Sequence, residues 1–235
     1  MREEPATRTA RLWSGLDVRR GFLTATVGLA IANVIALALG FLAKSLQESV
    51  DTPLFERIDR AGTNGLTDVL ATVTKMGNVP QTQALTAIAA VGLALWFAQR
   101  GTRWWMPLVV LPTAWIGARG FQMIQAKVVG RDREVLALIG TEIGSYPSGG
   151  VMRIILVTGV AAYLVVHYVR SSRRTTQLMF TGVALVGLVE AFARTRLNQH
   201  WFTDVVGGVI FGVLFLLVAI TTIRAFDPDP HHIYL

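Results

Sequence analysis

The chain has 235 residues, of which 52% are hydrophobic and 16% are charged, and its mean hydropathy is +0.49. This balance excludes an ordinary soluble domain and predicts a polytopic membrane protein. The net charge is +7, but the basic residues are spread over the ends of apolar segments, so we expect no nucleic-acid partner. The chain has no cysteine, which excludes disulfides and thiolate metal sites.

Six apolar runs are long enough to cross a bilayer. The polar, basic residues 1–20 lead into the first run, which is too long for a signal-peptide core and predicts an uncleaved helix. Residues 45–65 predict a loop with a surface helix, and residues 66–76 predict an amphipathic segment that ends at a Gly-Asn-Val-Pro break. The expected spans are residues 21–43, 81–99, 104–126, 151–170, 175–193 and 202–223. We therefore expect an all-α, six-helix membrane domain over residues 21–225, with a short amphipathic extracytoplasmic segment and a polar cytoplasmic tail at 226–235.

Loop charge predicts how this bundle is oriented. Basic residues gather in the N-terminal segment and after the second and fourth spans, and the positive-inside rule makes that side cytoplasmic. Both termini of this integral cell-membrane protein are then cytoplasmic. The opposite side nevertheless collects three basic clusters: Lys127, Arg131 and Arg133; Arg153; and Arg194 and Arg196. A basic pocket on the side where positive charge is usually scarce indicates an anionic ligand.

The connection between the fifth and sixth spans carries the strongest chemical signal. Arg194, His200 and Asp204 lie there, and ionisable groups at a membrane helix end are functional candidates. The four-residue spacing lets Asp204 hold the His200 imidazole in one orientation, and the Arg194 guanidinium suits a phosphate-like dianion. Glu190, one turn earlier, is expected to pair with Arg194. The neighbouring arginines would repel a cation, so we expect no metal.

A second segment, Ser145 to Gly150, runs straight into the fourth span with the sequence Ser-Tyr-Pro-Ser-Gly-Gly. Such a turn at a helix start aims free N–H groups, a hydroxyl and the positive end of the helix dipole outward. Most turns of this kind only cap a helix. Beside the His200 segment, however, Ser148 and Gly149 form a candidate phosphate cradle.

These segments resemble the motifs of the type 2 phosphatidic acid phosphatase family of membrane lipid phosphatases. Family members carry a Lys/Arg-rich first motif, a Pro-Ser-Gly-His second motif and a Ser-Arg-x5-His-x3-Asp third motif. Here the third motif reads Ala193-Arg194-x5-His200-x3-Asp204. The resemblance implies that His200 is the nucleophile, that Asp204 orients it and that Arg194 binds phosphate. It further implies phosphate binding by the first motif, which contains Lys127, Arg131 and Arg133.

Two departures from the family pattern bear on activity. The first motif is one residue short and lacks its prolines, which leaves open whether Arg131 or Arg133 reaches phosphate. Gly150 stands where the family has the histidine that protonates the leaving group. Loss of a general acid costs about 10²–10⁴-fold in rate, and least for a phosphate leaving group, whose second pKa is about 6. The substrate is then a lipid diphosphate, or Glu142 or Asp132 supplies the proton, or the enzyme is weak, or the glycine is an engineered inactivating change.

We therefore expect a membrane lipid phosphatase acting at the outer leaflet without a metal or other cofactor. Its substrate would be a lipid phosphate or diphosphate, of the isoprenyl diphosphate or phosphatidyl phosphate type, and its intermediate a phosphohistidine. The alternative is an inactive family member that binds phospholipid head groups or a protein partner, which Gly150 favours. A transporter fits less well, because no pair of broken helices is evident.

Overall fold

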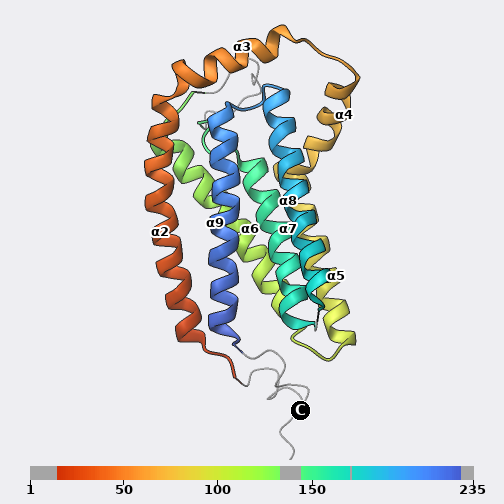
Figure 1. Cartoon of the computed structure of the whole chain (residues 1–235). Helices are drawn as coiled ribbons and strands as arrows, with labels where there is room; N and C mark the ends of the chain where they lie inside the picture. The colour runs from red at the N-terminus through yellow and green to blue at the C-terminus, as the bar shows by residue number, and fades with distance from the viewer. Residues whose placement is uncertain (1–14, 133–143, 170, 229–235) are drawn as a thin grey trace, which may run out of the picture.

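The computed structural model describes residues 15–132, 144–169 and 171–228 (Figure 1). These residues form helices and turns with no strand among them, which confirms the all-α prediction. Five described helices are long and apolar enough to cross a membrane. They are α2 (Val18–Ser45), α5 (Val79–Gln99), α7 (Gly149–Tyr168), α8 (Arg173–Arg196) and α9 (Phe202–Phe226).

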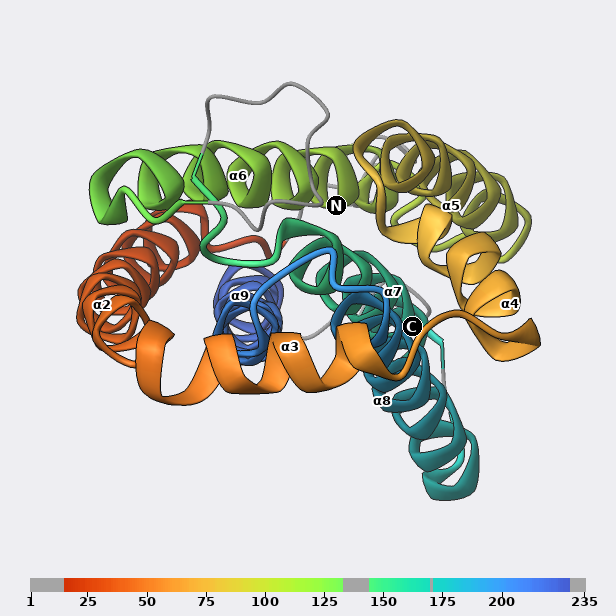
Figure 2. The same ribbon diagram turned by 90° about the horizontal axis from the view of Figure 1, so that it is seen from above.

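The third predicted span corresponds to α6 (Met106–Val129), which has 24 residues. It is long enough to cross a bilayer but is not among the five apolar helices, because Arg119, Gln122, Gln125 and Lys127 interrupt its apolar residues. Figures 1 and 2 show α6 running obliquely across the bundle, whereas α2 and α9 run nearly parallel to each other. Five helices thus qualify as spans by composition, and α6 is a more polar, inclined helix whose length also suffices to cross a bilayer.

Helix α7 lies at the centre of the bundle. In its most apolar stretch 78% of residues are buried, compared with 17–39% in the other four apolar helices. It packs against α5, α6, α8 and α9. The remaining helices keep exposed apolar faces, such as Phe22 and Leu23 of α2, that suit lipid contact.

The segment between α2 and α5 is mostly helical. A π-helical turn, η1 (Gln47–Asp51), continues into α3 (Thr52–Arg60), and α4 (Gly65–Val73) is followed by a 3-10 turn, η2 (Thr74–Gly77). Asn64 starts α4 with a reciprocal capping arrangement with Thr67. Figure 1 shows α3 lying across one end of the bundle, and α4 packs against α8.

The two ends of the bundle differ in character. The N-terminal ends of α7 and α9 meet the C-terminal ends of α6 and α8 below α3 (Figure 1). At the opposite end Arg103, which we counted among the cytoplasmic loop charges, is fully buried. Its Nε lies 2.6 Å from Asp227 Oδ2, and the Tyr168 hydroxyl donates to the same carboxylate oxygen at 2.9 Å. This ion pair ties the α5–α6 connection to the end of α9.

Candidate active site

His200 and Asp204 lie where α8 gives way to α9. Helix α8 ends at Arg196, Asn198 adopts a left-handed backbone (φ 50°), and α9 begins at Phe202. His200 Nδ1 is 3.7 Å from Asp204 Oδ2, and both side chains are buried. A slight side-chain rotation closes this gap, and catalytic hydrogen bonds are often long before substrate binds. The carboxylate is therefore placed to orient the imidazole.

Arg131 holds the other oxygen of Asp204. Its Nη1 pairs with Asp204 Oδ1 and donates to Thr203 Oγ1 at 2.7 Å, its Nη2 pairs with Asp51, and its Nε donates to Gln47 at 3.1 Å. Asp51 also accepts from the N–H and the hydroxyl of Thr203, at 2.9 and 2.6 Å. The Arg131, Asp51 and Asp204 side chains have no exposed surface. A carboxylate–guanidinium–carboxylate chain thus fixes η1 to the first turn of α9.

The turn before α7 packs directly on this pair. The Ser148 N–H donates to the Asp204 carbonyl oxygen at 2.9 Å. The Ser148 hydroxyl is buried and has no hydrogen-bond partner in the described part of the chain. Such groups are normally satisfied by water or a ligand. Tyr146, just before the turn, is also buried, and this burial, with the nearby Asp204 charge, raises the pKa of its hydroxyl.

Arg194 is held by four protein acceptors. Its Nε donates to Glu190 Oε1 at 2.7 Å, which confirms the predicted pair, and its Nη1 donates to Gln199 at 3.0 Å. Its Nη2 donates to Asn78 Oδ1 at 2.9 Å and to the Thr74 carbonyl at 3.0 Å. Glu190 accepts a further bond from the Thr74 hydroxyl at 3.1 Å. The turn η2 and the start of α5 therefore fix the direction of this guanidinium.

The Glu190–Arg194 ion pair occupies the space beside Gly150, where the family motif has a histidine. A Cβ atom at Gly150 would lie 2.8 Å from Arg194 Nη2 and 3.0 Å from Glu190 Oε1. A Cβ at Gly77, on the other side of the pair, would lie 1.9 Å from Glu190 Oε1. Both glycines leave room for the Glu190–Arg194 pair, so the lack of a side chain at Gly150 fits the packing around it.

The described residues of the first motif lie in different surroundings and do not converge on one site. Arg131 turns to Asp51 and Asp204, as described above. Lys127 is exposed, about 150° around the helix from the centre of the buried face of α6, and has no hydrogen bond or ion pair with a described residue. Asp132 is exposed, and its carbonyl accepts from the Trp201 indole at 3.0 Å. Arg133 and Glu142 lie outside the described residues.

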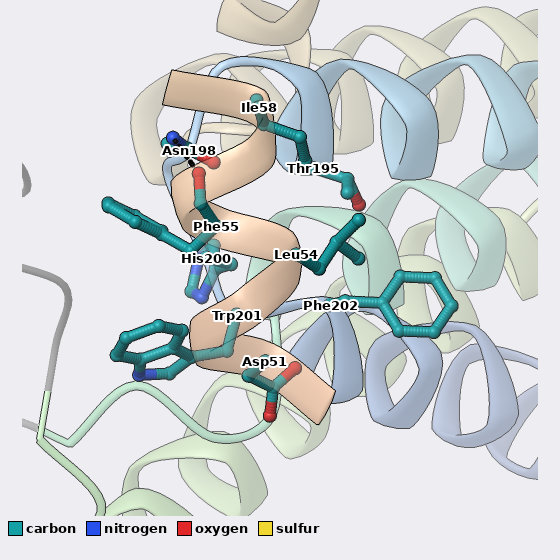
Figure 3. Close-up of a pocket in the computed structure, with 9 residues that line it drawn as sticks. All are labelled: Asp51, Leu54, Phe55, Ile58, Thr195, Asn198, His200, Trp201 and Phe202. Atoms are coloured by element: carbon teal, nitrogen blue, oxygen red, sulfur yellow. Dashed lines mark hydrogen bonds between the residues drawn. The ribbon is translucent and has the colours of Figure 1, made fainter. Parts of the chain in front are cut away.

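Helix α3 covers the His200 side of the site. Figure 3 shows α3 crossing over His200, with Phe55 and Trp201 beside the imidazole. The space between them is about 10 Å³, room for roughly one water. The Phe55 and Trp201 rings are 5.3 Å apart, and Asn198 donates to the Phe55 carbonyl at 3.3 Å. A phosphate reaching His200 from this side requires α3 to shift.

Sequence reasoning missed Asp51, Thr203, Gln47 and Asn78 as supports of the site. Asp51 belongs to a polar segment with several acids and has no local feature that marks it out. The one signal in the sequence was Arg131, since a guanidinium at a membrane helix end needs an acidic partner.

The part of the chain that carries this site is similar to a known protein family. Residues 138–227 match the model of the PAP2 superfamily, and this stretch contains the second and third motifs. The family resemblance drawn from those motifs is thereby confirmed. Among solved structures, the fold is similar to the "first transmembrane PAP2 type phosphatidylglycerolphosphate phosphatase from Bacillus subtilis", with a TM-score of 0.67 and 23% identity over 79% of this chain and 92% of that chain. No curated protein sequence gives a significant match.

Proposed function

We propose that this protein is an integral membrane phosphatase that hydrolyses a lipid phosphate or diphosphate through a phosphohistidine. One observation carries the proposal. The His200–Asp204 pair, the Arg194 guanidinium and the glycine turn at the start of α7 converge at one end of a membrane bundle, within the stretch that matches the PAP2 superfamily. Loop charge favours the outer side of the membrane for this end and the cytoplasm for both termini.

The chemistry follows from the groups that surround the imidazole. His200 Nε2 attacks phosphorus and forms an N–P bond while the bond from phosphorus to the leaving oxygen breaks, and the electron pair departs with that oxygen. Asp204 stabilises the positive charge on the imidazole. Arg194 and the N–H groups at the start of α7 stabilise the charge on the other phosphate oxygens. Water then attacks phosphorus, the N–P bond breaks, phosphate leaves and a proton passes to solvent.

The leaving group decides which substrate class suits this site. A monophosphate expels an alkoxide, which requires a proton, and Gly150 supplies none. A diphosphate expels a lipid monophosphate, which carries the charge without protonation because its second pKa is about 6. The proposed substrate is therefore a lipid diphosphate of the isoprenyl type, with phosphatidyl phosphates as poorer substrates.

Phosphate release by the purified full-length protein in lipid nanodiscs tests this function. We expect release from an isoprenyl diphosphate, an acid-labile phosphate bound to nitrogen during turnover, and neither in His200→Ala. Thermal unfolding of His200→Ala shows whether the variant remains folded. Release at the wild-type rate in a folded His200→Ala variant overturns the mechanism, and no release from diphosphate or monophosphate by the wild type overturns the function.

The second candidate is a family member that binds lipid head groups without hydrolysis. Two observations favour it: the missing acid at Gly150 and the closed cover of α3 over His200. Saturable binding of lipid phosphate to nanodisc-embedded protein, with no phosphate release over a prolonged incubation, would establish this function instead.

A further inference from the structure

Arg153, on α7 one turn after Gly150, is a buried cation with no acidic partner among the described residues. Its Nη1 donates to Gln122 Oε1 at 2.6 Å, its Nη2 to the Gly77 carbonyl at 3.1 Å and its Nε to the Thr82 hydroxyl at 3.3 Å. The residue is only 3% exposed, and all three acceptors are neutral. Within the described residues no carboxylate lies within ion-pair distance of it. A buried charge left without a counter-charge is costly, which makes the surroundings of Arg153 attractive to an anion.

Arg119 of α6 strengthens this positive charge. Its Nη1 donates to the same Gln122 oxygen at 3.2 Å, so two guanidinium groups share one neutral acceptor. Two cations this close repel each other in a low-dielectric interior. The only described carboxylate near them is Glu190, which is already paired with Arg194. Among the described residues, three guanidinium groups and one carboxylate give this region a net charge of two positive units, which a bound dianion would balance.

The Arg119–Arg153 pair and Arg194 lie on opposite sides of the Ser148–Gly150 turn. A Cβ at Gly149 would fall 2.1 Å from Gln122 Oε1, so the acceptor shared by Arg119 and Arg153 packs against Gly149. A Cβ at Gly150 would meet the Arg194 guanidinium at 2.8 Å. The start of α7 is thus flanked by one arginine that belongs to a family motif and by a pair that does not.

The interface between α5 and α7 leads from Arg153 to a groove that could hold a hydrocarbon chain. An apolar groove of about 410 Å³ lies further along α5 and α7 and is lined by Ala89, Gly92, Leu93, Ala161, Ala162, Val165 and Met179. Thr82 and Arg153 precede this groove by seven and eight residues, or roughly 10–12 Å of helix. A lipid with its anionic group at Arg153 would therefore direct its chain along α5 and α7 into the groove.

We propose that Arg153, assisted by Arg119, binds the phosphate that stays on the lipid when a diphosphate is cleaved. This inference rests on the proposed function. When His200 Nε2 takes the terminal phosphorus, the bridging oxygen keeps the electron pair and the departing lipid monophosphate gains one negative charge. A guanidinium beside that oxygen stabilises the new charge, so Arg153 compensates by charge for the proton donor that Gly150 lacks.

Substrate selectivity separates this role from a structural one. Arg153→Gln removes the charge and keeps the hydrogen-bonding shape, Arg153→Lys keeps the charge, and Arg174→Gln makes the same change at an exposed position at the far end of α8. The measurement is kcat/KM in nanodiscs for an isoprenyl diphosphate and for the monophosphate with the same chain. We expect Arg153→Gln to lose roughly 10²-fold on the diphosphate and at most threefold on the monophosphate, because one charge-stabilising donor contributes about 10²–10³. Arg153→Lys should recover part of the loss, and Arg174→Gln should match the wild type.

Equal losses on both substrates, or no loss on either, would overturn the inference while leaving the phosphatase proposal intact. If the wild type hydrolyses neither lipid, the proposed function fails, and binding decides the inference. The His200→Ala variant should then bind the isoprenyl diphosphate more tightly than the monophosphate, and adding Arg153→Gln should remove that difference. If Arg153→Gln does not fold, Arg119→Gln provides the same comparison with a partly exposed residue.

Discussion

Replacing Gly150 by histidine would restore the family motif, yet the structure predicts a loss rather than a gain. The Cβ atom alone would meet Arg194 Nη2 at 2.8 Å and Glu190 Oε1 at 3.0 Å, and the imidazole extends further. The ion pair must therefore move, and Arg194 loses its bonds to Asn78 and Thr74 as well as to Glu190. Breaking a buried pair costs about 3–5 kcal/mol. Displacing a phosphate-stabilising donor costs about 10²–10³-fold in rate.

We therefore expect Gly150→His to unfold at a lower temperature and to lose roughly 10²-fold on both lipid substrates. Gly65→His is the matched control, because a Cβ at Gly65 has nothing within 4 Å. The double variant Gly150→His, Glu190→Ala removes one of the two obstructing side chains and releases Arg194 from its carboxylate, so that the guanidinium can move away from the imidazole. In that background a proton donor should raise the ratio of monophosphate to diphosphate hydrolysis above that of Glu190→Ala alone. A Gly150→His variant with unchanged thermal stability and at least 10²-fold faster monophosphate hydrolysis would refute the reasoning.

Three further predictions follow from the same contacts. Asp51→Asn keeps the size of the side chain that pairs with Arg131 but removes its charge, so we expect kcat to fall more than tenfold with little change in KM. Glu48→Gln, at an exposed acid in the same turn, is the control, and equal kcat values in the two variants would contradict the prediction. Gly92→Leu fills the apolar groove, so KM should rise severalfold for long-chain lipids but not for short-chain ones, whereas Gly117→Leu, on an open face of α6, should change neither. Single cysteines introduced at Val50 and Ser172 of this cysteine-free chain should react with an impermeant thiol reagent from opposite sides, and labelling from outside at Ser172 but not at Val50 would reverse the proposed orientation.

The spans were predictable because each depends on the length of its own apolar run. All six runs coincide with helices within a few residues at each end, and α6 differs only in being more polar, because its polar side chains contact neighbours that the run itself does not reveal. Gln125, for example, is completely buried and donates to Asn33 of α2 at 2.7 Å, a contact across 92 positions. Mean hydropathy averages such polar residues with their apolar neighbours in the run, so it cannot identify the residues that they contact.

The site was predictable where chemistry is encoded locally. The i,i+4 spacing places Glu190 beside Arg194 and His200 beside Asp204, and both contacts are present. The segment η1–α3 was not predictable in this way, because Asp51 is placed by Arg131 and Thr203, 80 and 152 positions away. The fit of Gly150 to the Glu190–Arg194 pair is also a tertiary property, since it depends on where α8 lies against α7.

Charge balance on the two sides of the glycine turn distinguishes the arginines that the first motif left ambiguous. Arg131 lies between two buried carboxylates, so Arg131, Asp51 and Asp204 together carry one negative charge. Its guanidinium is committed to Asp204, so its contribution is to hold the carboxylate that orients His200. On the other side Arg119, Arg153 and Arg194 lie near a single described carboxylate, Glu190, which is paired with Arg194. Under the proposed function, a dianionic substrate would be attracted to the second group of charges and would approach along α7. The Ser148–Gly150 turn thus separates the carboxylates beside His200 from the arginines that are proposed to bind the substrate.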